Sequence, residues 1–210
     1  MTERIEVLTH SSIRITSSVG IIYIDPYQVG REYHDADYIF ISHDHCDHYS
    51  PNDLKKVIGE NTVIIVPKKM EQAVLADGFP KVVSVSTGKK MKVEKLEFET
   101  IPAYNTLKPF HPKSSDWCGY ILITDGKRIY IAGDTDATKE AKAVQCDIAL
   151  VPIGGTFTMD PKKAAELINT ICPETAIPTH YGSVVGRKTD ADVFEKYIDP
   201  SIKVEKKIKI

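Results

Sequence analysis

One short stretch of the chain concentrates side chains that bind metals. Residues 43–48 read His-Asp-His-Cys-Asp-His, so three of the seven histidines and two acids fall within six positions. Imidazole nitrogens and carboxylate oxygens are the usual protein ligands of zinc, manganese and iron. His43 and His45, two positions apart on an extended segment, are expected to point the same way and hold one ion. Asp47 and His48 are expected to turn the other way and hold a second ion.

Two later segments end in ligand-type residues where strands are expected to stop. A strand over residues 128–132 leads to Asp134 through a glycine that permits close backbone approach, and a strand over 175–178 leads to His180. The histidine-rich stretch likewise follows a continuously apolar segment, 38–42, which is typical of a strand buried on both faces. If the three strands lie parallel, their ends meet at one edge, where α/β proteins usually place their sites. Asp134 would then be able to bridge two cations.

Each of these residues also has a plainer interpretation. The histidine-rich stretch could be a polar surface loop, Asp134 a turn former, and His180 an edge histidine with its hydrogen bonds satisfied. Their expected convergence on one edge favours the metal site over three separate roles. Cys46 lies inside the stretch, but its side chain alternates away from the ligands, so we expect it to pack rather than bind metal.

The elements that must position these residues are strands first, and then strands alternating with helices. Ser50 and Asp160 are N-cap residues that each precede a proline suited to the first helical turn, and Asp125-Gly126 is a hairpin signal. Apolar and β-branched runs predict strands over residues 4–8, 12–16, 20–24, 38–42, 62–66, 82–85, 91–93, 96–101, 119–124, 128–132, 148–151 and 175–178. Capping and apolar spacing predict helices over 51–58, 67–76, 138–145, 161–171 and 190–197, before a lysine-rich tail.

Length and composition indicate a single globular domain over residues 1–210, with sheets at its centre and helices outside. The chain is 42% hydrophobic and 27% charged, which argues against disorder. Its 27 basic and 29 acidic residues leave a net charge of -2, so no nucleic-acid partner is expected. No apolar run approaches the roughly 20 residues that span a bilayer, and no signal peptide is visible, so we expect no membrane partner and a cytoplasmic location. The four cysteines are scattered and lack zinc-finger spacing, so we expect them to be reduced thiols in the cytoplasm.

Five blocks of the sequence, taken together, resemble the metallo-β-lactamase superfamily. The blocks are Ile24-Asp25-Pro26, the stretch 43–48, Ala132-Gly133-Asp134-Thr135-Asp136, residues 152–159 and Ile177-Pro178-Thr179-His180-Tyr181. The chain is similar within that superfamily to predicted metal-dependent hydrolases related to ascorbate-6-phosphate lactonase and N-acylphosphatidylethanolamine phospholipase D. The resemblance implies an α+β fold, a four-layer αββα sandwich with the site at the edge between two sheets. It also implies two divalent metal ions as cofactors, zinc first, with manganese or iron as alternatives.

The resemblance also implies a ligand set. The implied ligands are His43 and His45 for the first metal, Asp47, His48 and His180 for the second, and Asp134 as a bridge between them. The first metal is expected to have one further histidine. Relatives often place it as Ala-x-His after a strand, whereas this chain reads Ala103-Tyr104-Asn105 at that place.

One further histidine and one acid complete the predicted site. His111 is the only histidine between the histidine-rich stretch and Asp134, so we predict it as the missing ligand, with a loop histidine between two prolines as the alternative. Asp25 also matches the family. As a strand-end acid beside the histidines, it is predicted to accept a ring N–H and fix a tautomer, the alternative being a turn residue before Pro26.

The function predicted from these features is hydrolysis of a small molecule. A metal-bound hydroxide would attack a phosphoester, a phosphodiester or a lactone-type substrate, with Asp47 as the catalytic residue that orients the water or passes a proton. Basic residues near the site would favour a phosphate, and the candidates are Lys108, Lys113 and Arg187. The loop 154–159 could line the pocket. Tyr104, Trp117 and Tyr181 are candidates for walling the cleft, but packing in the core or on the surface is the more usual role of such residues. We expect the enzyme to form a homo-oligomer.

Two other functions remain open at this point. Diiron members of the same superfamily carry out redox chemistry, but they have a flavin domain, which this chain lacks, and an acid in place of His45. A metal-free binding module of the same fold is the third possibility, against which the nearly complete ligand set argues.

Overall fold

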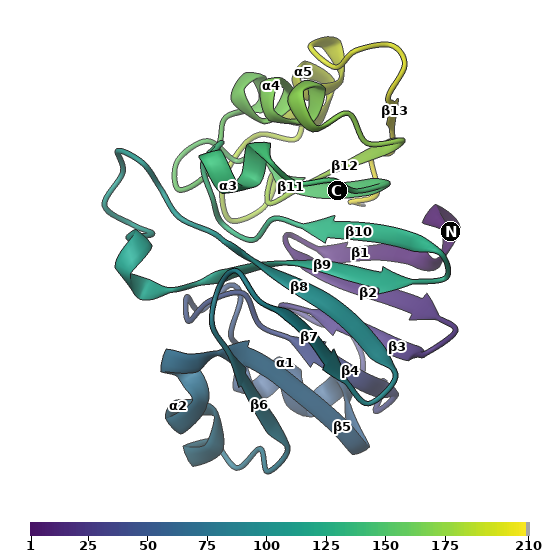
Figure 1. The fold of residues 1–210 in the computed structure, drawn as a ribbon, viewed down its shortest axis with the longest axis vertical. Helices are drawn as coiled ribbons and strands as arrows, with labels where there is room; N and C mark the ends of the chain where they lie inside the picture. The colour runs from purple at the N-terminus through teal and green to yellow at the C-terminus, as the bar shows by residue number, and fades with distance from the viewer. Residues whose placement is uncertain (209–210) are drawn as a thin grey trace.

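Two β-sheets facing one another form the centre of the molecule in the computed structural model, which describes residues 1–208 (Figure 1). The first sheet has the strand order β1-β2-β3-β4-β5-β6, and the second has the order β13-β12-β11-β10-β9-β8-β7. The strands of the first sheet are β1 Ile5–Thr9, β2 Ser12–Ser17, β3 Gly20–Ile24, β4 Ala36–Phe40, β5 Ile58–Pro67 and β6 Val82–Val85. Those of the second are β7 Lys90–Val93, β8 Leu96–Pro102, β9 Cys118–Thr124, β10 Lys127–Ile131, β11 Ile148–Pro152, β12 Thr175–Thr179 and β13 Lys203–Val204.

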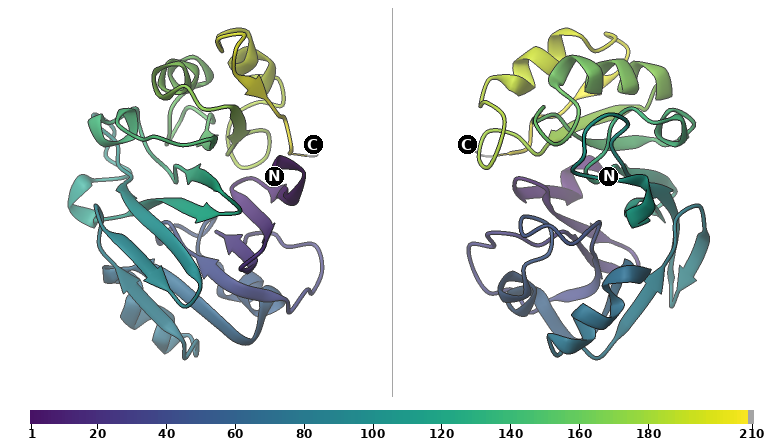
Figure 2. Two further views of the ribbon diagram at one scale, coloured as in Figure 1. Left: turned by 45° about the vertical axis from the view of Figure 1, so that its right-hand side comes forward. Right: turned by 90° about the vertical axis from the view of Figure 1, so that its left-hand side faces the viewer.

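Helices cover the outer face of each sheet, so the predicted four-layer αββα sandwich of the α+β class is confirmed. The helices are α1 Pro51–Val57, α2 Glu71–Ala76, α3 Lys139–Lys142, α4 Pro161–Ile171 and α5 Asp190–Lys196, with short 3-10 turns at Thr2–Arg4, Lys68–Met70 and Lys113–Ser115. One outer core cluster joins α1 and α2 to the first sheet, and another joins α3, α4 and α5 to the second. The views of Figure 2 place α4 and α5 at the opposite end of the molecule from α1 and α2. Within residues 1–208 no helix is both long and apolar enough to cross a membrane.

Strands that read as continuous apolar runs have both faces buried. In β3, Ile22 and Ile24 enter the core between the two sheets, whereas Tyr23 packs into the cluster under α1 and α2. In β4, Phe40 lies in the inner core and Ile39 in the outer one. Successive side chains of a strand point to opposite faces, so a strand covered on both faces has no polar positions to alternate with.

The structure corrects several of the predicted element bounds. The helix predicted over 67–76 begins as the 3-10 turn Lys68–Met70 and is α-helical only over Glu71–Ala76. The helix predicted over 51–58 ends at Val57, because β5 already begins at Ile58 rather than at residue 62. Ile58 pairs with Ala36, and the register then shifts before the next pair, so the early part of β5 is an irregularity that alternation cannot reveal. The helix predicted over 138–145 forms only Lys139–Lys142. The lysine-rich tail contains the edge strand β13, which pairs in parallel with β12.

The carboxylate of Asp53 fixes the loop that follows β3 against α1. It accepts hydrogen bonds from the backbone N–H groups of Gln28 and Val29, at 2.9 and 3.0 Å, and from Ser50 Oγ and Lys56 Nζ, both at 2.8 Å. Burial raises the pKa of Asp53, but these hydrogen bonds outweigh burial and leave that pKa below its usual value. Folding therefore favours the ionised carboxylate.

Asp53→Ala should lower the free energy of unfolding by about 2 kcal/mol, since hydrogen bonds to a charged group contribute about 1.5–3 kcal/mol. Because the pKa of Asp53 is lower in the folded state, its contribution is complete above the unfolded-state pKa and is lost as pH falls through the folded-state value. Denaturant melts at several pH values test this. The wild type and Asp53→Ala should converge in acid, and equal stability of the two proteins at pH 7 would contradict the prediction. Asp53→Asn keeps an acceptor oxygen and should lose less.

Candidate metal centre

The direction of the strands brings six loops to one edge of the sandwich. In the first sheet, β3 and β4 run parallel, and β1 runs the same way because it is antiparallel to β2, itself antiparallel to β3. In the second sheet, β10, β11 and β12 run parallel, and β8 shares their direction through two antiparallel pairings with β9. The carboxyl ends of β1, β3, β4, β8, β10 and β12 lead to His10, Asp25, His43, His111, Asp134 and His180 respectively.

The segment that leaves β4 is anchored to both sheets before it reaches the histidines. Ile41 N–H donates to Ile65 in the first sheet at 2.9 Å, and Tyr120 Oη of the second sheet donates to the carbonyl of Ile41 at 2.7 Å. The chain then turns, and His48 N–H donates to the carbonyl of His45 at 2.9 Å. The stretch 43–48 is therefore a tight turn rather than the extended segment expected from the sequence, and the turn separates His43 and His45 from Asp47 and His48.

Three histidines form one group of potential ligands at this edge. The ligand atoms of His43, His45 and His111 all lie within 4.8 Å of one another. His43 Nε2 lies 3.1 Å from His45 Nδ1. His43 and His111 are buried, whereas His45 is partly exposed toward the cleft described below. The structure thus brings together the three residues predicted for the first metal, although they come from loops of different sheets.

A second group collects the residues predicted for the other ion and adds one that was not predicted. Its members are His10, Asp47, His48 and His180, whose ligand atoms also lie within 4.8 Å of one another. Asp47 Oδ2 lies 3.1 Å from His10 Nε2, 3.5 Å from His180 Nε2 and 3.7 Å from His48 Nε2. Asp47 is the only one of the four that is not fully buried among the described residues.

Asp134 lies between the two groups. Its Oδ1 is 3.3 Å from His48 Nε2, and its Oδ2 is 3.1 Å from His180 Nε2 and 3.4 Å from His111 Nε2. The carboxylate therefore contacts ligands predicted for both metals, as a bridging residue must. Gly133 before it adopts φ +64°, and a Cβ there would lie 3.2 Å from the carbonyl oxygen of Cys118, so glycine fits both the turn and the close packing.

Three buried side chains hold the ring orientation of the histidines. Asp25 Oδ2 lies 2.7 Å from His48 Nδ1, the contact that its predicted role requires, and the Asp25 carboxylate also accepts from Ser42 N–H and Oγ at 2.7 and 2.6 Å. Ser42 Oγ is in turn 2.9 Å from His43 Nδ1. Asn105 Oδ1 lies 2.9 Å from His111 Nδ1. Such partners orient metal-binding imidazoles and select the tautomer whose other nitrogen faces the ion.

Asn105 stands where relatives often have a histidine, and it supports a ligand instead of being a histidine itself. It is buried, and its side-chain amide joins His111 to the backbone carbonyl of Phe157, which accepts from Nδ2 at 2.9 Å. The chain thus departs from the Ala-x-His pattern, and His111, six residues after Asn105, joins His43 and His45 instead.

Three residues of this edge have a strained backbone. His10, Asp25 and His180 have φ values of 46°, 46° and 57°, in the left-handed region that side chains larger than glycine rarely adopt. Each such residue costs on the order of 1–3 kcal/mol and persists where the surrounding structure imposes it, typically at functional sites. At His180 the neighbouring backbone imposes the conformation, since its N–H donates to the carbonyl of His10 at 3.0 Å. Gly154 leaves room beside it, because a Cβ at Gly154 would overlap the His180 carbonyl oxygen.

The donor atoms of the two groups fit metal ions. Eight buried side-chain atoms of the described residues have no hydrogen-bond partner, and five of them belong to this centre: His48 Nε2, His111 Nε2, Asp134 Oδ1, and Nδ1 and Nε2 of His180. Buried polar atoms are nearly always paired in proteins, so such a concentration needs an explanation. Imidazole nitrogens and carboxylate oxygens aimed at one another, but not bonded, are the donor set that divalent transition metals bind.

Burial and mutual repulsion keep part of the centre in the protonation state that metals need. Burial lowers the pKa of His43 well below its usual value and that of His111 to about 4, so both are neutral imidazoles at pH 7. For Asp134, burial raises the pKa, but the neighbouring histidines outweigh burial and hold it well below its usual range. Burial lowers the pKa of His180, but the Asp134 and Asp47 carboxylates raise it to about 9.

His10 is the residue of this centre that the sequence did not point to. It is fully buried in the turn between β1 and β2, and its ring lies 3.8 Å from that of His180, centre to centre. With it, six of the seven histidines of the chain lie at this edge; the seventh, His34, is exposed elsewhere. The sequence signal for His10 was weak. It precedes two serines in a turn between two strands, but no other ligand-type residue lies beside it in the sequence.

A cleft of about 350 Å³ opens onto the centre. It is lined by His45, Cys46, Asp47, Asp134, Phe110, Phe157 and Val184. Phe157 lies in the loop predicted to line the pocket, but Phe110 and Val184 were not predicted. Cys46 is exposed at this cleft, so the expectation that it packs away is wrong.

The three aromatic residues considered as cleft walls have packing or hydrogen-bonding roles instead, the more usual alternative for them. Tyr104 donates its hydroxyl to Glu140 at 2.8 Å, and Tyr181 is buried in the cluster under α4 and α5. Trp117 packs behind the metal centre, with its ring centre 5.0 Å from that of His43 and 5.5 Å from that of His111. None of the three lines the cleft that the structure describes.

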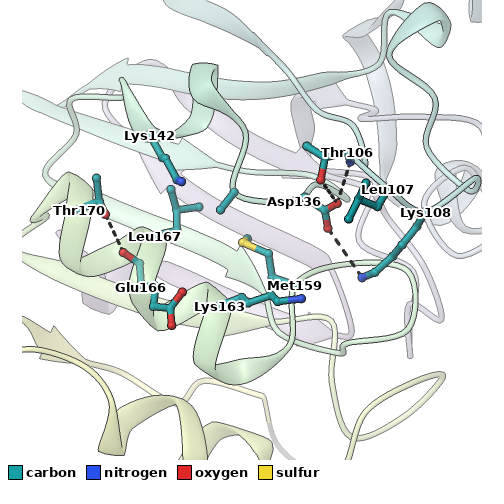
Figure 3. Close-up of a pocket in the computed structure, with 11 residues that line it drawn as sticks. Thr106, Leu107, Lys108, Asp136, Lys142, Met159, Lys163, Glu166, Leu167 and Thr170 are labelled. Carbon is teal, nitrogen blue, oxygen red and sulfur yellow. Dashed lines mark hydrogen bonds and ion pairs between the residues drawn. The ribbon is translucent and has the colours of Figure 1, made fainter.

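The basic residues considered for phosphate recognition also point away from the centre. Lys108 pairs with Asp136 at 3.7 Å and donates to the carbonyls of Gly155 and Thr158. Figure 3 shows this lysine with Asp136 at a separate hollow, of about 500 Å³, beside α4. Lys113 pairs with Glu140 at 2.8 Å. Arg187 is exposed and does not line the cleft of residues 1–208.

Comparison with known proteins agrees with the fold. A profile described as the beta-lactamase superfamily domain matches residues 4–180. A UPF0173 metal-dependent hydrolase of Symbiobacterium thermophilum is 31% identical over 208 residues, 91% of this chain and 89% of that protein. The crystal structure of a protein from Parabacteroides distasonis that is named as a metal-dependent hydrolase has a TM-score of 0.83 to this structure at 30% identity. The match covers 98% of this chain and 93% of that one.

A more distant structure shares the fold alone. CmlA, a diiron β-hydroxylase from Streptomyces venezuelae, has a TM-score of 0.75 at 14% identity, covering 96% of this chain and 52% of that one. The fold therefore occurs with more than one chemistry. On the match of the superfamily profile to most of its length, this chain belongs to the metallo-β-lactamase superfamily, alongside relatives named as metal-dependent hydrolases.

Proposed function

We propose that this metal-dependent hydrolase cleaves a phosphoester, phosphodiester or lactone-type bond in a small molecule, with two divalent cations as cofactors. One observation carries the proposal: two groups of buried or half-buried ligand-type side chains meet at one edge and share Asp134 between them. A cleft large enough for a small molecule opens onto both groups.

The residues that would hold the cations follow from the two groups. One ion would be held by His43, His45 and His111, the other by Asp47, His48 and His180, with Asp134 shared. We propose zinc as the metal because imidazole-rich sites suit it, with manganese or iron as alternatives. When bound, the cations supply Lewis acidity that makes a water nucleophilic near neutral pH and stabilises negative charge on the substrate.

Asp47 is proposed to orient the attacking water. It lines the cleft and is partly exposed there, so a water in the cleft can donate a hydrogen bond to it. Burial raises the pKa of Asp47, but the His10 and His180 imidazoles beside its carboxylate outweigh burial and keep that pKa well below its usual value. Passing a proton to or from that water is the alternative role for the same carboxylate.

The competing functions have less support. Diiron redox members of the superfamily are expected to carry an acid at the position of His45, and here a histidine contacts His43 instead. A metal-free binding module would leave five buried polar atoms of the described residues without partners. Each unpaired buried polar group costs on the order of 1–3 kcal/mol, so a chain without metal would have little reason to keep them.

Removal of the metal should abolish turnover, and its return should restore it. Metal content is measured by elemental analysis before and after dialysis against a chelator, together with activity on phosphomonoesters, phosphodiesters, lactones and thioesters. We expect about two ions per chain, and a higher melting temperature for the loaded protein because the ions bind only the folded state. Full turnover by the metal-depleted protein would refute the proposal.

His45→Ala and His34→Ala form a matched pair for the same assay. His45 belongs to the centre, whereas His34 is an exposed histidine outside it. His45→Ala should lower both metal content and turnover, and His34→Ala should leave both near the wild-type values. Equal behaviour of the two variants would show that the histidine group does not hold the metal.

A further inference from the structure

The cleft above the metal centre has two chemically different sides. Its lining includes the ligand-type residues His45, Asp47 and Asp134, here called the floor, and the apolar residues Phe110, Phe157 and Val184, here called the wall. A molecule that fills the cleft must therefore place its reacting bond at the floor and another part of itself against the apolar wall. The chemistry of the wall then restricts the substrates that the centre can cleave.

Three loops contribute to the wall, and two of them are held together at the metal centre. Phe110 and Phe157 meet edge to face, with ring centres 4.7 Å apart and planes at 82°. Phe110 directly precedes His111, and Asn105 connects His111 to the backbone of Phe157. The aromatic pair is thus fixed to the same framework that positions a predicted metal ligand, rather than lying on a free loop.

Apolar surface is left exposed at this wall. Phe110 is 42% exposed and Val184 is 48% exposed. Exposing large apolar side chains beside a polar centre forfeits burial energy, so their grouping at the cleft indicates an apolar occupant. Because the wall and the floor line the same cleft, we take that occupant to be the part of the substrate next to the scissile bond.

The lining of the cleft provides no cationic side chain for a substrate phosphate that lies away from the reacting bond. None of the seven residues that line it within residues 1–208 is Lys or Arg. Lys108 is engaged with Asp136 and two backbone carbonyls, and Lys113 with Glu140. A phosphate group away from the reacting bond would have to give up its hydration against aromatic rings, which is costly without a cation.

We propose that the substrate is a neutral carboxylic ester or lactone whose apolar acyl group packs against Phe110, Phe157 and Val184, and that it carries no separate phosphate. This inference rests on the proposed function and narrows it. The reaction breaks the bond between the carbonyl carbon and the ester oxygen. Water supplies a hydroxyl to the carbon and a proton to the departing oxygen, so the products are an acid and an alcohol and no oxidant is needed.

A chain-length series tests the wall directly. The metal-loaded enzyme is assayed on p-nitrophenyl acetate, butyrate and hexanoate, and on p-nitrophenyl phosphate and bis(p-nitrophenyl) phosphate. We expect kcat/KM to rise by about threefold for each added methylene that the wall buries. A higher kcat/KM for either phosphate ester than for the hexanoate would overturn the inference while leaving the hydrolase proposal intact.

Variants at Val184 distinguish an effect of the wall on substrate preference from an effect on metal binding. Val184→Lys places a cation at the cleft and should shift the preference toward the phosphate esters by about tenfold or more, whereas the similarly shaped Val184→Thr should change it less. Metal content should stay unchanged in both. Leu75→Lys, at an exposed leucine on α2 that does not line the cleft, should leave the preference as it is in the wild type. An unchanged preference in Val184→Lys would contradict the inference.

A binding measurement gives an answer that does not depend on turnover. Hexan-1-ol is titrated into the metal-free, 15N-labelled protein, and the shifts of backbone amides are followed by NMR. We expect saturable shifts at residues 110, 157 and 184 that weaken in Val184→Lys, and none with inorganic phosphate. If no compound is hydrolysed by the metal-loaded protein, the proposed function fails. Absence of hexan-1-ol shifts at the wall would refute the inference by itself.

Discussion

Replacing Asp134 by asparagine should remove most of the bound metal and reduce turnover by about a hundredfold or more. Asparagine keeps the shape of the side chain but replaces one charged oxygen by an N–H donor. In the native protein, Oδ1 faces His48, and Oδ2 faces His180 and His111. The change therefore affects both groups at once. Loss of a partner that only supports a metal ligand costs about 10- to 100-fold in affinity, so loss of a shared ligand should cost at least as much.

Elemental analysis, isothermal titration with zinc and kcat/KM on the best ester measure this prediction. Asp136→Asn is the matched control, because Asp136 lies two residues away and pairs with Lys108 outside the centre. It should keep the native metal content. Asp134→Asn protein with two ions per chain and wild-type kcat/KM would rule out the shared carboxylate and, with it, the proposed arrangement of the ions.

Substitution of His10 should weaken the centre through Asp47. Its Nε2 lies 3.1 Å from Asp47 Oδ2, and its ring packs 3.8 Å from that of His180. In His10→Asn the shorter amide replaces the imidazole and no longer reaches Asp47. Asparagine tolerates the left-handed φ of 46° at this position better than most residues do. We expect a 10- to 100-fold loss, of about the size found for other residues that orient metal ligands. The loss should appear in zinc affinity or in kcat, with little change in the melting temperature of the metal-free protein.

A conservative variant distinguishes orientation from folding. His10→Gln offers an amide N–H that can again donate to Asp47, so part of the lost affinity should return. A merely structural role would instead lower the stability of both variants alike and leave zinc affinity unchanged in the folded fraction. That pattern would disprove the positioning role of His10.

Periodicity located nearly all the elements because the strands and helices obey local rules. Ser50 and Asp160 cap α1 and α4 as predicted, accepting from the backbone N–H of Asp53 and Lys163. The early start of β5 was missed because it depends on pairing between Ile58 and Ala36, a contact between distant residues. The short edge strand β13 was missed for the same reason, since a two-residue strand has no periodicity of its own.

The sequence by itself determined the fold class and most of the residues of the metal centre. The stretch 43–48 is dense in ligands, and Asp134 and His180 each follow a recognisable strand. Such patterns involve only residues that are close together in the sequence, so they can be recognised without a structure. The order of the blocks was specific enough to indicate the superfamily before any contact was known.

Only the tertiary structure decided which other residues join the candidate metal centre and what lines the cleft that leads to it. His10 and Asn105 have no ligand-type neighbours in the chain, and they join the centre because the ends of β1 and β8 reach the same edge as β4. Phe110, Phe157 and Val184 form one wall although loops far apart in the sequence carry them. Contacts of this kind depend on strand direction and on sheet packing, which are properties of the folded chain and leave no local pattern in its sequence.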